Sequence, residues 1–327
     1  MSNDSLQAVS RDFRLKRLKK RSLYPLRQLY TLMSHIPPMT SSSLSNLNFN
    51  HSIVNVVGGN QTTVTNVYPE TQVSHPRSFN DAPVGRLSAY FTGREEDLDR
   101  VEQILNRTQY GIPNCCIIHG MPGVGKSQLS LCYAAKSFDG GLYTYIFWTS
   151  ATSVDKLTQG FSKVLDLVGH PDRHVQDQSI KLTTARLWLE DCSAHWLFII
   201  DNVDKVTLDF LSLHFPRINA QGNVLFTTRT VDVANALANM TRIPHSTLKL
   251  PTLSLHDSIC LLLNDAGIRS QIITPVQLNY AEQLVESVGR LPLAVVQAAS
   301  FIKQTDTTLD NMLQLYKSES KIEVRAV

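Results

Sequence analysis

The stretch CCIIHGMPGVGKSQLS, residues 115–130, decides the fold of this chain. Its first five residues, 115–119, are mostly apolar and predict a short buried strand, whereas the amphipathic run 128–137 predicts a helix. Between them, residues 120–127 fit the pattern G-x-x-x-x-G-K-S. This loop between a strand and a helix is the context in which the pattern binds phosphate, so the sequence predicts an anion-binding loop.

The residue types of this loop have physical reasons. Glycine lets the backbone wrap around a phosphate and present its N–H groups, and the following helix N-terminus adds the positive end of its dipole. We expect Lys126 to reach the β- and γ-phosphates of a nucleotide. We expect Ser127 to offer its hydroxyl to Mg²⁺.

A second apolar run, residues 196–200, ends in Asp201, 75 residues after Lys126. A strand that ends in a carboxylate supplies what Mg²⁺ needs opposite a phosphate loop, because Mg²⁺ prefers oxygen ligands. We therefore predict that Asp201 acts on the metal, directly or through its waters. Asp204 is a second candidate catalytic acid.

Residues 222–229, GNVLFTTR, predict another strand, which ends in polar residues. In open α/β sheets, ligands bind at the carboxyl ends of the strands. Arg229 is therefore a candidate sensor of the γ-phosphate.

Composition and turn residues divide the chain into six regions. Proline and serine clusters mark the joints, and helical periodicity dominates beyond residue 245. The regions are a basic flexible tail (1–45), an Asn-rich β-prone motif (46–68), a linker (69–88), a nucleotide-binding α/β domain (89–248), a helical subdomain (249–316) and an irregular tail (317–327).

The net charge of +3 is unevenly distributed. The first 30 residues carry eight Lys or Arg against Asp4 and Asp12, which leaves the rest of the chain at about −3. The body is therefore not a nucleic-acid-binding surface by charge alone. The basic run 11–21 is a solvated arm, or else a nuclear-import or anionic-surface patch. A mitochondrial presequence is a further alternative, and the two aspartates argue against it.

The cysteines indicate a reducing compartment. The chain has five, an odd number, without a C-x-x-C pair, which predicts reduced thiols in a cytoplasmic protein. No apolar run approaches 18 residues, and the N-terminus lacks the apolar core of a secretory signal. We therefore expect neither a membrane span nor secretion.

Residues 48–67 are rich in Asn, Thr and Val and almost uncharged. Two strands, 54–57 and 61–67, around Gly58-Gly59 are one interpretation. Such a segment also suits stacked cross-β pairing. It loosely resembles the prion-like motifs of some fungal NOD-like receptors, which template an effector. A disordered spacer or a lone hairpin is the alternative.

Four motifs in order resemble the nucleotide-binding module of NB-ARC proteins, within the STAND class of P-loop ATPases. They are FTGRE (91–95), the phosphate loop (120–127), the strand FIIDNVD (198–204) and GRLPLA (289–294), which has Arg290 between the glycine and the leucine of the GLPLA motif. The resemblance covers about residues 85 to 310. It implies a three-layer α/β/α P-loop NTPase domain with a central parallel five-stranded sheet, followed by a small helical subdomain.

The resemblance also implies roles for individual residues. ADP or ATP would bind with Mg²⁺, and the backbone near Phe91, Gly93 and Arg94 would hold the adenine together with Pro292. Arg229 would sense the γ-phosphate. The implied phosphate contacts are Gly120, Gly123, Gly125, Lys126, Ser127 and Gln128, and the implied metal ligands are Ser127 and Asp201.

Two departures from the family pattern matter. Strongly hydrolytic members carry a second acid after the metal-binding one, but here that position is Asn202, and an amide cannot take a proton from water. We expect slow hydrolysis at most. The chain also ends where the family continues with a winged helix, so a truncated member and a fragment are both open.

The function that these features predict is a nucleotide-controlled signalling switch of NOD-like receptor type. Its partners would be the nucleotide, further copies of the chain on activation, and an effector protein at residues 46–68. The alternatives are a catalytic, AAA+-like ATPase and a STAND transcriptional regulator whose basic arm binds DNA.

Overall fold

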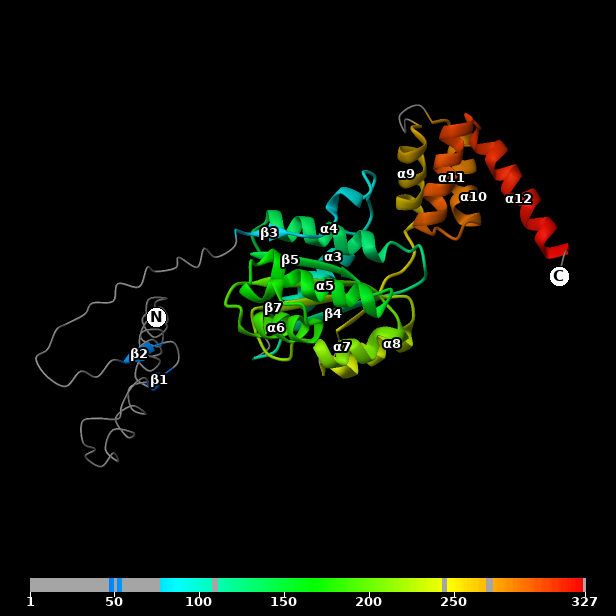
Figure 1. Ribbon diagram of the computed structural model, residues 1–327. Helices are drawn as coiled ribbons and strands as arrows, with labels where there is room; N and C mark the ends of the chain where they lie inside the picture. The colour runs from blue at the N-terminus through cyan, green and yellow to red at the C-terminus, as the bar shows by residue number, and fades with distance from the viewer. Residues whose placement is uncertain are drawn as a thin grey trace, which may run out of the picture. The chain divides into compact units, whose positions relative to one another are not determined.

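The computed structural model describes residues 47–49, 52–54, 77–107, 111–242, 246–268 and 273–325 (Figure 1). The chain divides into two compact units, residues 1–72 and 73–327. The first unit contains a pair of antiparallel strands, β1 (Leu47–Phe49) and β2 (Ser52–Val54). The second unit holds everything else described below.

A six-stranded sheet forms the centre of the second unit. Its strands lie in the order β3-β5-β6-β7-β4-β8, and every neighbouring pair is parallel. The strands are β3 (Phe79–Asn80), β4 (Asn114–His119), β5 (Tyr145–Ser150), β6 (Trp196–Val203), β7 (Gly222–Thr228) and β8 (Thr247–Lys249).

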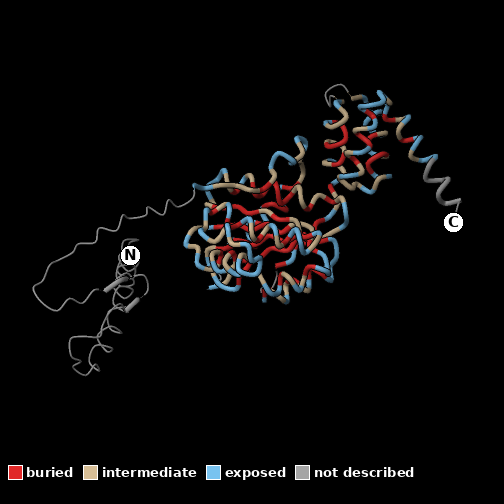
Figure 2. The backbone as a smooth tube through the Cα atoms, viewed as in Figure 1, coloured by how far each residue is buried: buried red, intermediate tan, exposed pale blue. Residues whose placement is uncertain are grey.

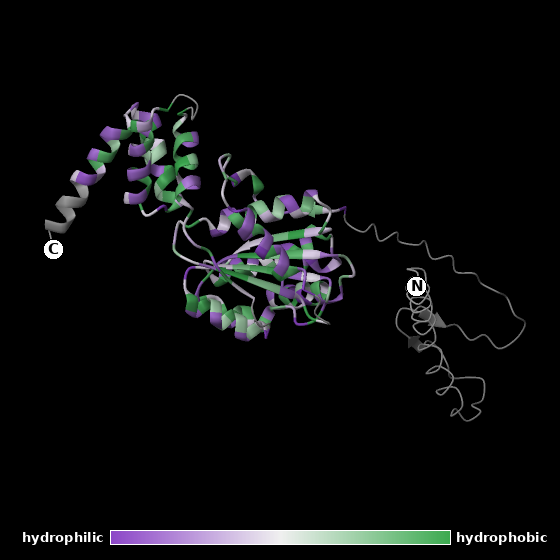
Figure 3. Ribbon diagram, turned by 180° about the vertical axis from the view of Figure 1, so that it is seen from behind, coloured by the Kyte–Doolittle hydropathy of each residue, from purple (hydrophilic) through white to green (hydrophobic). Residues whose placement is uncertain are grey.

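Helices cover both faces of the sheet, because residues along each strand alternate between two cores. In β4, Cys115 and Ile117 belong to one core, and Cys116 and Ile118 belong to the other. Figures 2 and 3 show the buried, hydrophobic strands between helices with exposed outer faces. The first core packs α5 (Val154–Leu167), α6 (Gln178–Asp191), α7 (Leu208–His214) and α8 (Val231–Thr241), and the second packs α3 (Glu95–Leu105) and α4 (Lys126–Asp139).

This three-layer architecture confirms the predicted fold class.

Short 3₁₀ helices occur at η1 (Val84–Arg86), η2 (Pro171–His174) and η3 (Lys205–Thr207). Because the strands are parallel, β4, β6 and β7 all end at the same edge of the sheet. The predicted phosphate loop, Asp201 and Arg229 therefore share that edge.

A helical subdomain follows β8 and has a core of its own. α10 begins with a capping box between Thr274 and Gln277 and has Pro275 in its first turn. Within the part of the chain that the structure describes, no helix is both long and apolar enough to cross a bilayer. The helices are α9 (Leu255–Ala266), α10 (Pro275–Ser287), α11 (Pro292–Thr305) and α12 (Leu309–Arg325).

The structure corrects two expected boundaries. The range 69–88 is not only a linker, because Phe79 and Asn80 pair with β5 and add β3 as a sixth strand. The ring of Phe79 also packs on that of Tyr145, with 5.2 Å between the ring centroids. Residues 317–325 are not irregular, because α12 continues to Arg325. The buried side chains of Leu309 and Leu313 anchor its first turns, and adding residues to an existing helix costs little.

In the Asn-rich motif, the described strands β1 and β2 pair Leu47 with Val54. The predicted strands 54–57 and 61–67 around Gly58-Gly59 lie outside the described residues except for Val54, so they stay a prediction. Residues 55–76, which contain the predicted second strand, lie outside the described residues, as does the basic run 11–21.

Gly222 offers a test of the packing in this sheet. A Cβ atom at Gly222 would lie 2.1 Å from the ring of Trp196, which is fully buried in the neighbouring strand. We expect Gly222→Ala to lower the free energy of unfolding by about 1–3 kcal/mol, because the ring has no room to move. Urea unfolding measures the change. Gly85→Ala, where a Cβ would meet nothing within 4 Å, should be close to neutral.

Candidate functional site

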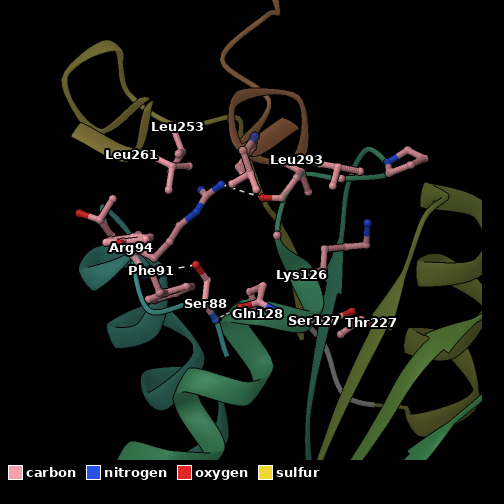
Figure 4. Close-up of a pocket in the computed structure, with 18 of the residues that line it drawn as sticks. Ser88, Phe91, Arg94, Lys126, Ser127, Gln128, Thr227, Leu253, Leu261 and Leu293 are labelled. Atoms are coloured by element: carbon pink, nitrogen blue, oxygen red, sulfur yellow. Dashed lines mark hydrogen bonds between the residues drawn. The ribbon is translucent and has the colours of Figure 1, made fainter. Parts of the chain in front are cut away.

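A pocket of about 520 Å³ lies between the phosphate loop and the helical subdomain (Figure 4). It brings together most of the residues predicted from sequence. The predicted residues that line it are Phe91, Arg94, Gly123, Gly125, Lys126, Ser127, Gln128, Arg229 and Pro292.

The phosphate loop ends with Gly125 in a left-handed conformation, with φ of 101°, and α4 begins at the next residue. A side chain at Gly125 would be strained in this conformation. No side chain caps the N-terminus of α4. The first N–H groups of a helix lack partners within it, so this end of α4 suits an anion.

Lys126 is 8% exposed and donates from Nζ to the carbonyls of Gly120 and Met121 at 2.7 and 2.9 Å. Burial lowers the pKa of Lys126, and the charge of Arg229 lowers it further, while Asp201 opposes the shift. The pKa of His119 is lowered by burial and by its neighbours Lys249 and Lys126. The concentration of positive charge at this edge favours an anionic ligand.

Two hydroxyl groups converge on one carboxylate oxygen beside the loop. Ser127 Oγ donates to Asp201 Oδ1 at 2.8 Å, and Thr227 Oγ1 donates to the same oxygen at 2.6 Å. The serine begins α4, whereas Asp201 lies on β6 and the threonine on the adjacent β7. The structure thus joins the two predicted metal ligands, although Asp201 itself does not line the pocket.

A bulge in β6 sets the geometry beside that carboxylate. Ile200 pairs with Phe226 and Val203 with Thr228, so two residues of β6 lie opposite the single Thr227. Asn202, one of the two, has φ of 62° and donates its backbone N–H to Thr227 Oγ1 at 2.8 Å.

The same bulge places the Asn202 side chain at the pocket wall. Arg229 donates from Nε to Asn202 Oδ1 at 3.2 Å, and both side chains line the pocket. The amide oxygen therefore orients the arginine that sequence analysis predicted as a phosphate sensor.

The structure does not bring Asp204 into the pocket. Its carboxylate accepts the backbone N–H of Lys205 at 2.6 Å and caps η3, in a capping box with Thr207. An acidic residue after a strand also serves as a helix cap, and this local role explains Asp204 better than catalysis does. Gly93 and Gly120 also lie outside the set of residues that line the pocket.

Two of the predicted residues have structural partners that sequence did not indicate. The side chain of Gln128 accepts the N–H of Ser88 at 2.7 Å and donates to the carbonyl of Arg86 at 3.0 Å. The guanidinium of Arg94 bonds to Asp97 and to two backbone carbonyls. Both side chains therefore position the chain around the pocket.

The far end of the pocket is apolar. Figure 4 shows Leu253 and Leu261 beside each other, away from Ser127 and Thr227. The helical subdomain contributes much of this end, and nothing in the local sequence near the leucines indicates it. The lining residues that sequence analysis did not assign to the site are Ser88, Tyr90, Thr92, Pro122, Val124, Asn202, Thr227, Leu253, Leu261, Leu293 and Val296.

The chain is similar to known proteins in sequence. The family model described as the NB-ARC domain matches residues 94–270, more than half of the chain. A nucleotide-binding leucine-rich repeat (NLR)-like protein of Hyaloscypha variabilis is 26% identical over 269 residues, which are 78% of this chain and 26% of that protein. The chain therefore spans about a quarter of the length of this relative.

The fold also resembles that of a solved structure. Cdc6p from Pyrobaculum aerophilum superimposes with a TM-score of 0.50 at 12% identity, over 67% of this chain and 64% of that one. At this identity the likeness concerns the fold alone.

Thr227 should stabilise the edge of the sheet through its hydroxyl. Thr227→Val keeps the shape but leaves the N–H of Asn202 without its acceptor and removes one donor from Asp201. We expect it to lower the free energy of unfolding by about 1–3 kcal/mol, measured by urea unfolding. Thr247→Val on the exposed face of β8 is the matched control. Equal stability of the two variants would contradict the role of this hydroxyl.

Proposed function

Because this chain belongs to the NB-ARC domain family, we propose that it binds ADP and ATP in the pocket of Figure 4 and acts as a nucleotide-controlled signalling switch. The pocket itself carries the proposal, since its two ends differ in chemistry as the two ends of a nucleotide do. The loop end is basic and rich in backbone N–H groups. The other end is apolar.

The loop end supports binding of phosphates. A helix N-terminus without a side-chain cap follows the glycine turn, and Lys126 and Arg229 carry positive charge there. Lys126 would exchange its two carbonyl partners for phosphate oxygens, a stronger type of hydrogen bond because both groups are charged. Arg229, oriented by Asn202, would contact a terminal phosphate.

The apolar end supports binding of the base. Phe91, Leu253, Leu261 and Pro292 are among the apolar residues that line the pocket. A planar heterocycle buries its faces well between such groups. Backbone groups near Phe91 would supply the polar contacts.

A magnesium ion fits the residues beside the loop. Asp201 and Ser127 offer oxygen donors, which Mg²⁺ prefers, and they already lie within hydrogen-bond distance of each other. Among the described residues, no three His, Cys, Asp or Glu gather around a common point. The ion would therefore share its coordination with phosphates, and when bound it would neutralise their charge.

We expect binding to outweigh turnover. Rapid hydrolysis needs a base near the attacking water, but Asn202 is an amide, and the carboxylate of Asp204 is occupied in capping η3. For this reason we prefer a switch to a catalytic, AAA+-like ATPase.

The position of the pocket supports a switch. Its walls come from the α/β domain and from the helical subdomain, so a ligand in it contacts both. Binding energy that differs between two arrangements of these parts shifts their populations. We propose that the shift controls self-association and that residues 46–68 engage an effector. The alternative function that involves no catalysis is that of a transcriptional regulator, which would bind DNA through its basic arm.

Lys126→Ala tests nucleotide binding directly. We expect the purified wild-type chain to carry ADP and the variant to carry none, because the variant lacks the charge that faces the phosphates. Denaturation followed by chromatography of the released nucleotide measures the content. Lys136→Ala, at an exposed position in the last turn of the same helix, should keep the wild-type content. Unchanged nucleotide in Lys126→Ala would refute the proposal.

Asn202→Asp tests the account of slow turnover. Aspartate tolerates the left-handed backbone at this position and keeps an acceptor for Arg229. We expect ATP hydrolysis to rise by about 10²-fold, measured as phosphate release under Mg-ATP, because a carboxylate can take the proton. Adding Lys126→Ala to this variant should abolish the gain. Rapid hydrolysis by the wild-type chain would instead favour the catalytic alternative.

A further inference from the structure

Two successive carbonyl groups of the phosphate loop are bound from outside the loop. The carbonyl of Gly123 accepts the N–H of Leu293 at 3.2 Å, and that of Val124 accepts Nη2 of Arg94 at 2.9 Å. In a planar trans peptide, a carbonyl and the following N–H point in opposite directions. Holding the Val124 carbonyl toward Arg94 therefore turns the N–H of Gly125 away from it, as an anion-binding loop requires.

The same nitrogen of Arg94 also reaches the segment that leads into the helical subdomain. Nη2 donates to the carbonyl of Pro251 at 2.9 Å, while Nη1 donates to Asp97 at 3.0 Å. Pro251 lies between the end of β8 and the start of α9, in the linker (residues 250–254) that joins the two parts. One buried donor group thus connects the phosphate loop to this linker.

Burial fixes the position of the Arg94 side chain. Arg94 is 4% exposed, so its charge is stabilised by these acceptors instead of by water. Removing one partner of a buried charge is costly. The backbone beside it is equally constrained. A Cβ at Gly93 would lie 2.3 Å from Cγ of Asp257 in the first turn of α9, so the FTGRE segment packs directly on the helical subdomain.

The contacts form a closed circuit. Leu253 in the linker donates its N–H to the carbonyl of Arg290 at 3.2 Å. Arg290 has φ of 51° and directly precedes the segment that carries Leu293, which returns to the loop at Gly123. A conformational change of the phosphate loop would therefore be transmitted to the helical subdomain through two contacts, that of Arg94 and that of Leu293.

From this circuit we infer that Arg94 is a positioning residue that couples phosphate binding to the linker, and that it acts through the backbone of the phosphate loop. A phosphate bound to the N–H of Gly125 stabilises the orientation in which Val124 faces Arg94. That in turn stabilises the contact of Arg94 with Pro251. The inference rests on the proposed function, since it assigns a mechanism to the same pocket.

Inorganic pyrophosphate is the probe that isolates this mechanism. It occupies the loop but has no base to touch Leu253 or Leu261 directly. Amide hydrogen exchange of peptides that cover residues 249–258 reports on the linker, with and without saturating pyrophosphate. We expect pyrophosphate to slow exchange there by about fivefold or more in the wild-type chain, as typical coupling energies allow.

Three variants of the full chain give the comparison. Arg94→Met removes the donors, and Arg94→Lys keeps the charge that Asp97 needs but loses the fork that spans two carbonyls. Arg100→Met changes an exposed arginine of the same helix. At saturating pyrophosphate we expect linker protection to be lost in Arg94→Met and Arg94→Lys and kept in Arg100→Met. Arg94→Lys keeps the test valid if Arg94→Met fails to fold.

The outcomes separate this inference from the proposed function. The inference would be overturned if the linker stays protected from exchange in folded Arg94→Lys. It would also be overturned if pyrophosphate binds to the wild-type chain without slowing amide exchange in the linker. A variant that binds no pyrophosphate at all would also overturn it, because Arg94 would then be a direct ligand contact. If the wild-type chain bound neither ADP nor pyrophosphate, the proposed function itself would be refuted.

Discussion

All six strands of the large sheet run in the same direction, so each delivers its carboxyl end to one edge. The site depends on this constraint. β4 ends in the phosphate loop, β6 in Asp201 and β7 in Thr227 and Thr228, although these segments are far apart in the sequence. The alternation of side chains along each strand then buries both faces under helices, which leaves only the edge for a ligand.

The polar side chains at that edge are positioned by hydrogen bonds to one another. Asp201 accepts two hydroxyl groups, Thr227 serves as both donor and acceptor, and Asn202 orients Arg229. Buried polar groups without partners are costly, so each of these contacts lowers the penalty of keeping the next group in place. The site is thus preorganised by side chains from two adjacent strands and the start of α4.

The bulge in β6 points two successive side chains, Asp201 and Asn202, at different partners. It places Asp201 against Ser127 and turns Asn202 toward Arg229. An amide in the second position keeps the hydrogen bond to the arginine but offers no base for hydrolysis. If the pocket binds a nucleotide as proposed, the same backbone feature would favour retention of the nucleotide over its hydrolysis. The helical subdomain lines the apolar end, so a retained nucleotide would touch both parts.

Sequence by itself determined the strand, G-x-x-x-x-G-K-S loop and helix at residues 115–130, and it singled out Ser127 and Asp201, which the structure joins by a hydrogen bond, because these features follow from local patterns. Glycine spacing, apolar runs and capping residues act within a few positions, and they fix strand, loop and helix wherever they occur. The same locality explains the errors. Asp204 caps a helix that was not expected, β3 forms by pairing with β5, which begins 65 positions after β3 ends, and α12 is anchored by the core of the helical subdomain. Only the tertiary structure decided that Leu253 and Leu261 close the pocket and that Arg94 joins the loop to Pro251, 157 positions away. No sequence pattern records such contacts, because they arise when the sheet and the helical subdomain pack together.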